Sequence, residues 1–408
     1  MCLLWIHFDF SIVGYAHSSV RAPNMEEWMK SKLCEQLGIK FPLFAFSHCR
    51  DVVAEVSKAG GFGCLGATGH TPKSLEIELK WIDQHIDNKP YGVDILVPAD
   101  FRNKEESATA KEIEAAIPQE HRTYIESLLE KHKIDTNNLW DNKIGDNHGD
   151  NMREVGAAPI LDVALSHSGC RMLVNALGVP PEFMRDKAKS AGVLVGALAG
   201  AKEHAIKHAE AGVDVVIVSG TEAGGHCGEI STMVVLPEVI RALEPYGDIP
   251  VLAAGGIATG RQMAAAMTMG AAGAWCGSVW LTTAEAETLS VVKQKMLAAT
   301  SRHTVRSRSR TGKPTRQLRS AWTDAWTEEH APPPLPMPLQ GLISEPALGR
   351  ISKLSENGHE GAKELATYWV GQAVGLMNEP TTSKQVVYDF MEDFGLAIER
   401  ASGLMEKD

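Results

Sequence analysis

One unit recurs along most of this chain: a short apolar run, a Gly/Ser-rich turn, an amphipathic stretch, and a glycine before the next run. It repeats from residue 41 to about residue 281. In the clearest copy, AKEHAIKHAEAGVDVVIVSG (201–220), residues 201–211 suit a helix, Gly212 its stop and residues 213–218 a buried strand. Strands and helices in alternation predict a parallel sheet.

Eight segments fit the strand part of this unit, and eight strands are the number that closes a barrel. They are residues 43–46, 63–65, 92–97, 172–176, 194–197, 213–218, 250–253 and 273–276. We therefore predict an α/β fold, a (β/α)₈ TIM barrel. An open doubly wound sheet is the alternative. It fits less well because the first glycine-rich turn, AGGFGCLG (59–66), lies before and within a strand instead of opening a helix.

The barrel is expected to span residues 37–282, after an N-terminal extension at 1–36. A helical insertion at about 99–159 follows the third strand, and its Glu, Lys and Asn content predicts a charged hairpin that is solvated or forms a lid over the barrel mouth. Within it, GDNHGDN (145–151) lacks the regular ligand spacing and terminal Glu of a calcium loop, so no metal is predicted.

Beyond residue 282 the strand spacing stops. Residues 283–408 predict a C-terminal helical appendage packed on the barrel. Its parts are a basic run at 302–320, a proline-rich segment at 331–341 that favours an extended strap, and amphipathic helices within 351–405.

Composition narrows the class of protein. A net charge of −11 argues against nucleic-acid binding and favours a small-molecule enzyme. Seven cysteines without a CxxC pair indicate neither a disulfide framework nor a zinc site, and favour the reducing cytoplasm. The apolar stretch at 1–15 is broken by His7 and Asp9 and is too short to span a membrane. The oligomeric state is left open.

Glycines follow the last two predicted strands, where a barrel carries its active face. AAGGIATG (253–260) and CGSVW (276–280) would bring backbone N–H groups close to an anion, because glycine has no Cβ in the way. Gly255, Gly256, Gly277 and Ser278 therefore predict a phosphate cradle, for a cofactor or for a phosphorylated substrate.

His226 follows the sixth predicted strand, within SGTEAGGHCGE (219–229). The two preceding glycines allow the backbone to approach a flat ligand and leave the imidazole over it. Because histidine titrates near neutral pH, His226 could accept a proton from a carbon acid or bind an anionic substrate. Cys227 has no evident base partner and is not predicted to be a nucleophile.

TEAGGHCGE, VLAAGGIATG and the later GS, in this order and spacing, resemble the nitronate monooxygenase family, formerly called 2-nitropropane dioxygenases. That family includes flavin-dependent enoyl-acyl-carrier-protein reductases. The resemblance is strong over residues 37–282. It continues through GKPTRQLRSAWTDAW (312–326), PLPMPLQG (334–341) and WVGQAVGLMN (369–378).

The resemblance implies an FMN-binding barrel without metal or disulfide. It makes His226 the active-site histidine and places Gly224 and Gly225 beside the isoalloxazine. Gly255, Gly256, Gly277 and Ser278 would then hold the FMN phosphate. The implied reaction is oxidation of an alkyl nitronate by O₂ to a carbonyl compound and nitrite, with His226 orienting the nitronate or deprotonating a nitroalkane over the flavin.

Three positions at strand ends depart from the family. The first strand usually ends in a Gln-x-Pro-Met-like stretch whose backbone meets the flavin, and here Phe46, Ser47 and His48 stand there. Asp94 replaces a frequent Asn, and Ser219 a frequent Gln or Asp. A carboxylate at residue 94 would raise the cost of reducing a flavin unless it is hydrogen-bonded.

Two other functions stay open. An NAD(P)H-driven FMN reductase of a quinone or enoyl thioester shares these motifs, and the basic run at 302–320 could receive a dinucleotide or acyl-carrier phosphates. A non-catalytic scaffold that presents its proline-rich segment to a partner is the third interpretation, against which His226 and the glycine turns argue.

Overall fold

The computed structural model of the protein describes residues 31–97, 116–141 and 154–404. Its centre is a closed barrel of parallel strands in the order β1-β2-β3-β4-β5-β6-β8-β9. The strands are β1 Leu43–Ser47, β2 Phe62–Gly66, β3 Tyr91–Ile95, β4 Cys170–Asn175, β5 Leu194–Ala199, β6 Val215–Ser219, β8 Val251–Ala254 and β9 Gly273–Cys276. Pairing of β1 with β9, Phe44 opposite Trp275, closes the ring. The predicted (β/α)₈ barrel is confirmed, and the open sheet is wrong.

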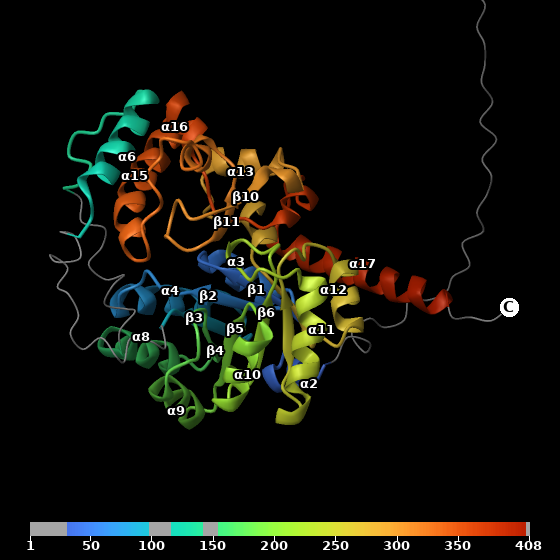
Figure 1. Cartoon of the computed structure of the whole chain (residues 1–408). Helices are drawn as coiled ribbons and strands as arrows, with labels where there is room; N and C mark the ends of the chain where they lie inside the picture. Colours follow the sequence, from blue (N-terminus) through green and yellow to red (C-terminus); the bar gives the residue numbers. More distant parts are fainter. Residues whose placement is uncertain (1–30, 98–115, 142–153, 405–408) are drawn as a thin grey trace, which may run out of the picture.

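Helices surround the barrel (Figure 1). They are α3 Arg50–Lys58, α4 Pro72–His85, α8 Glu154–Ser166, α9 Glu182–Ser190, α10 Lys202–Glu210, α11 Thr232–Leu243 and α12 Gly260–Thr268. The unit at 201–220 folds as its sequence predicts. Gly212 follows α10 with a φ of 74°, which suits glycine, and its N–H donates to the carbonyl of Ala209.

Inward-facing side chains fill the barrel. Alternate residues of β1 and β9 point inward, where Phe44 and Trp275 stack with ring centroids 6.4 Å apart. Leu33 and Leu37 of helix α2 (Lys32–Leu37) join the same cluster, so α2 closes the end of the barrel where the strands begin. The opposite end, where the strands finish, is left for the functional site.

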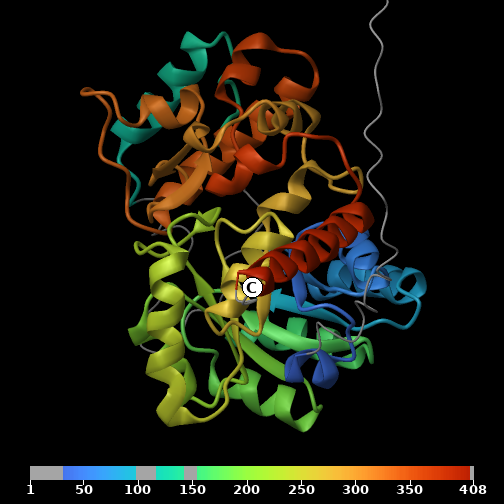
Figure 2. The same cartoon turned by 90° about the vertical axis from the view of Figure 1, so that its right-hand side faces the viewer.

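The eighth helical position of the ring is filled by α17, Ser383–Gly403. This helix packs against α12 and α3 and lies along the side of the barrel (Figure 2). The approach is close, because a Cβ on Gly260 would lie 1.9 Å from the carbonyl oxygen of Phe390. About a hundred residues separate β9 from α17 along the chain, in place of the short loop usual in this fold.

The elements between β9 and α17 form a second layer together with α6 of the insertion (Figures 1 and 2). We call this layer the cap. Its elements are α6 Gln119–Lys131, α13 Ser290–Leu297, β10 Thr304–Ser307, β11 Thr315–Leu318, α14 Ala321–Ala325, α15 Leu339–Glu356, α16 Glu360–Leu365 and η5 Gln372–Leu376. Ile125, Leu129, Trp322 and Ile343 are fully buried in its own hydrophobic core.

One expectation about the cap changes. The wholly solvated hairpin predicted for the insertion is wrong for α6, because its apolar face packs on α15. The proline-rich segment lies against α6, where His121 Nε2 is 3.0 Å from the carbonyl oxygen of Pro333. Residues 145–151 lie outside the described residues, and the boundaries 36/37 and 282/283 stay predictions.

The cap and barrel share a small sheet of order β10-β11-β7, in which β7 (Gly225–His226) comes from the loop after β6. The basic run is therefore a hairpin seated at the carboxyl end of the barrel. Among the described residues, no helix has the length and apolar character needed to cross a membrane.

Candidate active site

Glycines lie at the exits of β8 and β9, where the sequence predicts a phosphate cradle. Ala254 pairs with Trp275, so these two exits lie side by side. Gly255 and Gly256 have φ values of 97° and 74°, a backbone turn that side chains resist. Within the described residues, the N–H groups of Gly255, Gly256 and Gly277 donate to no other residue. Free amides without a shielding Cβ fit an anionic group such as a phosphate.

Ser278 lies at the same exit and is tied to the cap. Its Oγ accepts a hydrogen bond of 2.8 Å from the N–H of Gly371. Gly371 also lies close to the loop after β6, because a Cβ on it would be 2.6 Å from the carbonyl oxygen of Glu222. The same carbonyl accepts the N–H of Gln372 at 2.8 Å. A Cβ on Gly224 would lie 2.8 Å from the nitrogen of Gly371. Close packing against the cap is therefore enough to require glycine at residue 224.

Phe46, Asp94 and Ser219 lie at the carboxyl ends of β1, β3 and β6, the same end as the glycines. Phe46 stacks on Trp275 with centroids 6.3 Å apart, so its ring covers the apolar barrel interior. The Ser47 hydroxyl instead accepts the N–H of Cys49 at the start of α3. His48 is exposed, with Nδ1 3.1 Å from the carbonyl oxygen of Gly66.

The Asp94 carboxyl is 3% exposed, and its Oδ1 has no hydrogen-bond partner among the described residues. Burial raises the pKa of this carboxyl well above its ordinary range, because the charged form cannot be solvated. A protonated carboxyl can donate a hydrogen bond. An unpartnered polar atom at a strand exit fits a polar ligand above it.

His226 is held by the cap. In the β7–β11 pairing, His226 lies opposite Thr315, and Gly225 lies opposite Arg316. The imidazole donates a hydrogen bond to the carbonyl oxygen of Pro314. In the neutral form the second ring nitrogen remains an acceptor.

His226 is exposed, and its surroundings nevertheless lower its pKa. Loss of water around the charged form is the main cause, and the charge of Lys313 adds to it. The hydrogen bond to Pro314 acts in the opposite direction. The net shift is downward from the ordinary value of about 6.5, which favours the neutral imidazole, the form that can accept a proton.

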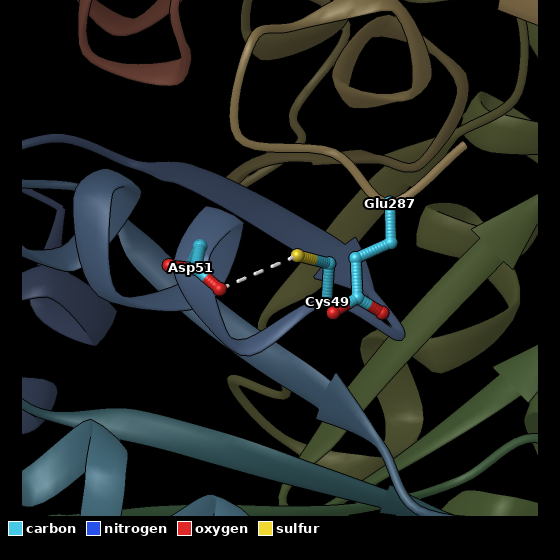
Figure 3. A group of neighbouring side chains, drawn as sticks. All are labelled: Cys49, Asp51 and Glu287. Carbon is cyan, nitrogen blue, oxygen red and sulfur yellow. Dashed lines mark hydrogen bonds between the residues drawn. The ribbon is translucent and has the colours of Figure 1, made fainter. Parts of the chain in front are cut away.

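One group of three potential metal ligands occurs in the described part of the chain: Cys49, Asp51 and Glu287, whose ligand atoms lie within 4.8 Å of one another (Figure 3). Burial raises the pKa of the Cys49 thiol, and its Sγ donates to the carbonyl of Glu285 at 3.0 Å. A protonated thiol is not a metal ligand. The geometry therefore fits a hydrogen-bonded structural cysteine.

The structure thus brings the predicted residues to one rim of the barrel, and it adds residues that the sequence analysis did not select. Gly371 and Arg316 both come from the cap. Arg316 is 7% exposed and donates from Nε to the carbonyl of Thr221 at 2.8 Å. The motifs around these residues carried the family resemblance, but nothing local in them indicated contact with a loop that lies 95 residues before Arg316 and about 150 before Gly371.

A closed barrel with free amides at the last two strand exits and an imidazole in the loop after β6 defines a class of barrel proteins that bind an anionic ligand at the strand exits. The model of the nitronate monooxygenase family matches residues 30–393. The chain belongs to this family and is an oxidoreductase.

Two sequence relatives support this family membership. The Mycobacterium tuberculosis protein Rv1533, named provisionally as a monooxygenase, is 50% identical over 383 residues, which are 93% of this chain and 100% of that one. A Staphylococcus haemolyticus protein, named provisionally as a nitronate monooxygenase, is 26% identical over 375 residues, 86% of this chain and 93% of that one.

Two solved structures share the fold. A nitroalkane oxidase from Streptomyces ansochromogenes has a TM-score of 0.73 at 24% identity and covers 91% of this chain and 100% of its own. FabK from Thermotoga maritima has a TM-score of 0.66 at 24% identity, with coverages of 92% and 99%. At these identities both comparisons support the architecture alone.

Proposed function

We propose that this protein is an FMN-dependent enzyme that oxidises alkyl nitronates with O₂ to a carbonyl compound and nitrite. One observation carries the proposal: His226, on the strand that pairs with the cap, shares a rim with free backbone amides at the last two strand exits. The family match and the name of the Staphylococcus haemolyticus relative support the same reaction.

The residues present fit FMN. Gly255, Gly256, Gly277 and Ser278 would hold its phosphate, since their amides and one hydroxyl proton are free to donate. The residues expected near the isoalloxazine ring are Phe46, Asp94, Ser219 and Gly225. A Cβ on Gly225 would have no atom within 4 Å, so there is open space beside this residue. Gly224 contributes by letting the cap approach. Bound FMN would supply the redox chemistry.

His226 is the base in this proposal. When the substrate is a neutral nitroalkane, the free imidazole nitrogen accepts the α-proton, and the carbon acid becomes the nitronate anion with its charge on the nitro oxygens. The bond to Pro314 keeps the ring in place and partly compensates the charge that the imidazole gains. When the substrate is already a nitronate, this step is absent.

The test starts from the visible spectrum of the purified protein. Bound FMN, oxygen uptake on adding a nitronate and release of nitrite would support the proposal. Protein that binds FMN but leaves nitronate unchanged would contradict it.

The rival function, an NAD(P)H-driven reductase, is favoured by one observation: the basic hairpin lies next to His226. Rapid anaerobic bleaching of the flavin by NADH or NADPH would support the rival. Inertness to both dinucleotides, together with nitronate turnover, would exclude it.

A further inference from the structure

A base must hold no proton on the nitrogen that faces its substrate, so in the proposed function His226 offers the nitro oxygens no hydrogen-bond donor there. A neutral imidazole has one N–H, and the Pro314 carbonyl already accepts it. The remaining nitrogen repels a nitronate oxygen through its lone pair. Recognition of the anion must therefore come from another group near the imidazole.

The hairpin β10–β11 supplies positive charge at this place. Lys313 stands in its turn, two residues before the register partner of His226, and its charge is close enough to influence the imidazole. Lys313 is exposed and forms no ion pair with a described residue. The exposed ammonium is thus free to meet a ligand.

Two further cations lie beside the same strand. Arg316 has no carboxylate within ion-pair distance in the described chain; its bonds go to the carbonyl of Thr221 and the hydroxyl of Thr304. Arg306 contacts Glu229 only at 3.5 Å, and its buried Nε has no partner among described residues. Both guanidinium groups act on the Cys227 thiol next to His226.

Among the described residues, two carboxylates, Glu222 and Glu229, are found near these three cations. Glu222 is near enough to affect Arg316 and Cys227, but its carboxylate accepts hydrogen bonds from the N–H and hydroxyl of Thr232. Glu229 is 83% exposed. Three cations against two carboxylates leave a positive excess around the imidazole, which suits an anion.

We propose that Lys313 is the residue that recognises the anionic oxygens of the substrate, so that the site selects nitronates, or planar anions of the same shape, over neutral molecules. The inference rests on the proposed function, in which His226 is the base. It gives the two residues separate tasks: the imidazole takes the α-proton from a nitroalkane, and the ammonium compensates the negative charge that remains on the nitro oxygens.

The first test does not depend on turnover. Nuclear magnetic resonance titration of histidine-labelled full-length protein follows the His226 imidazole in the wild type and in the variants Lys313→Met, Lys313→Arg and Lys353→Met. Lys353 is an exposed lysine on α15 and serves as the matched control. Loss of the Lys313 charge should raise the His226 pKa, whereas Lys313→Arg and Lys353→Met should leave it in place. An unchanged pKa in Lys313→Met would overturn the proposal.

The second test uses isobutyrate, an unreactive carboxylate with the shape of propyl-2-nitronate, titrated into the FMN-loaded protein by calorimetry in low-chloride buffer. We expect Lys313→Met to weaken binding about tenfold and Lys313→Glu to weaken it further, while Lys313→Arg retains binding. Equal affinity in wild type and Lys313→Met would refute the inference. Anion binding that needs Lys313, in a protein that does not oxidise nitronates, would uphold the subsite and reject only the proposed reaction.

Discussion

The ring of Phe46 is the nearest neighbour of any side chain added at Gly277, with Cδ1 3.9 Å from the place that a Cβ would occupy. The φ of Gly277 is −112°, which other residues adopt without strain. The folded chain itself therefore does not demand glycine here. A ligand that must reach the backbone would explain the residue.

Gly277→Ala should separate cofactor binding from folding. We expect an unchanged melting temperature for the FMN-free protein and a rise of about tenfold in the FMN dissociation constant, since the methyl group meets the phosphate. Riboflavin, which has no phosphate, should lose much less affinity. Fluorescence titration with both flavins measures the two dissociation constants. The control is Gly349→Ala on α15, where a Cβ would have no atom within 4 Å. Equal losses for both flavins would count against a phosphate at Gly277.

His226→Asn should keep bound FMN and lose about 10²- to 10⁴-fold in kcat with a nitroalkane, the usual contribution of a general base. Steady-state oxygen uptake gives the rate, and the visible spectrum gives the flavin content. His204→Asn, on the exposed face of α10, is the matched control. Full turnover in His226→Asn would show that the imidazole is not the base.

The pH dependence follows from the lowered pKa of His226. Only the neutral imidazole accepts a proton, so kcat/KM for a nitroalkane should stay level at neutral pH and fall on acidification, with its midpoint below the ordinary 6.5. Initial rates from pH 5 to 8 measure the profile. Lys313→Met should move the midpoint upward. A profile that stays flat down to pH 5 in the wild type would contradict the base role.

Asp94→Asn should change how stability depends on pH. Because burial raises the carboxyl pKa, the folded state holds the proton more tightly than the unfolded state, and unfolding releases it. Wild-type stability is therefore lost as pH rises above the unfolded value of about 3.9, by up to about 1.4 kcal/mol per pH unit until the folded pKa is reached.

An amide does not titrate, so the melting temperature of Asp94→Asn relative to the wild type should increase between pH 4 and 7. Scanning calorimetry on FMN-free protein measures the difference. Asp162→Asn, in an exposed ion pair with Lys187, serves as the control. Parallel pH curves for wild type and Asp94→Asn would mean that Asp94 is not buried as a neutral acid.

Local sequence patterns predicted the barrel well because its strands are short apolar runs closed by turn residues such as Gly212, and because parallel strands bring their exits to one rim. The glycines at 255, 256 and 277 were found for the same reason. Contacts between distant segments have no such local signature. Nothing around Thr315 indicates that it lies opposite His226. The sequence of α6 predicts a charged surface helix, and only the structure shows that its apolar face packs against α15.

A large separation along the chain also concealed the position of the last helix, α17. Its amphipathic pattern predicted a helix packed on the barrel, but only the structure shows that α17 fills the eighth position of the ring. Gly260 carries no sign of this in its neighbours along the chain, since the close contact with Phe390 joins residues 130 positions apart.

The strand opposite His226 also sets an order of events during synthesis. When the ribosome has made residues up to 282, all eight barrel strands exist, but the carbonyl that orients the imidazole has not yet been translated. The nascent barrel could collect flavin before it has an aligned base. Reactivity is thus withheld until the chain has been made beyond Pro314.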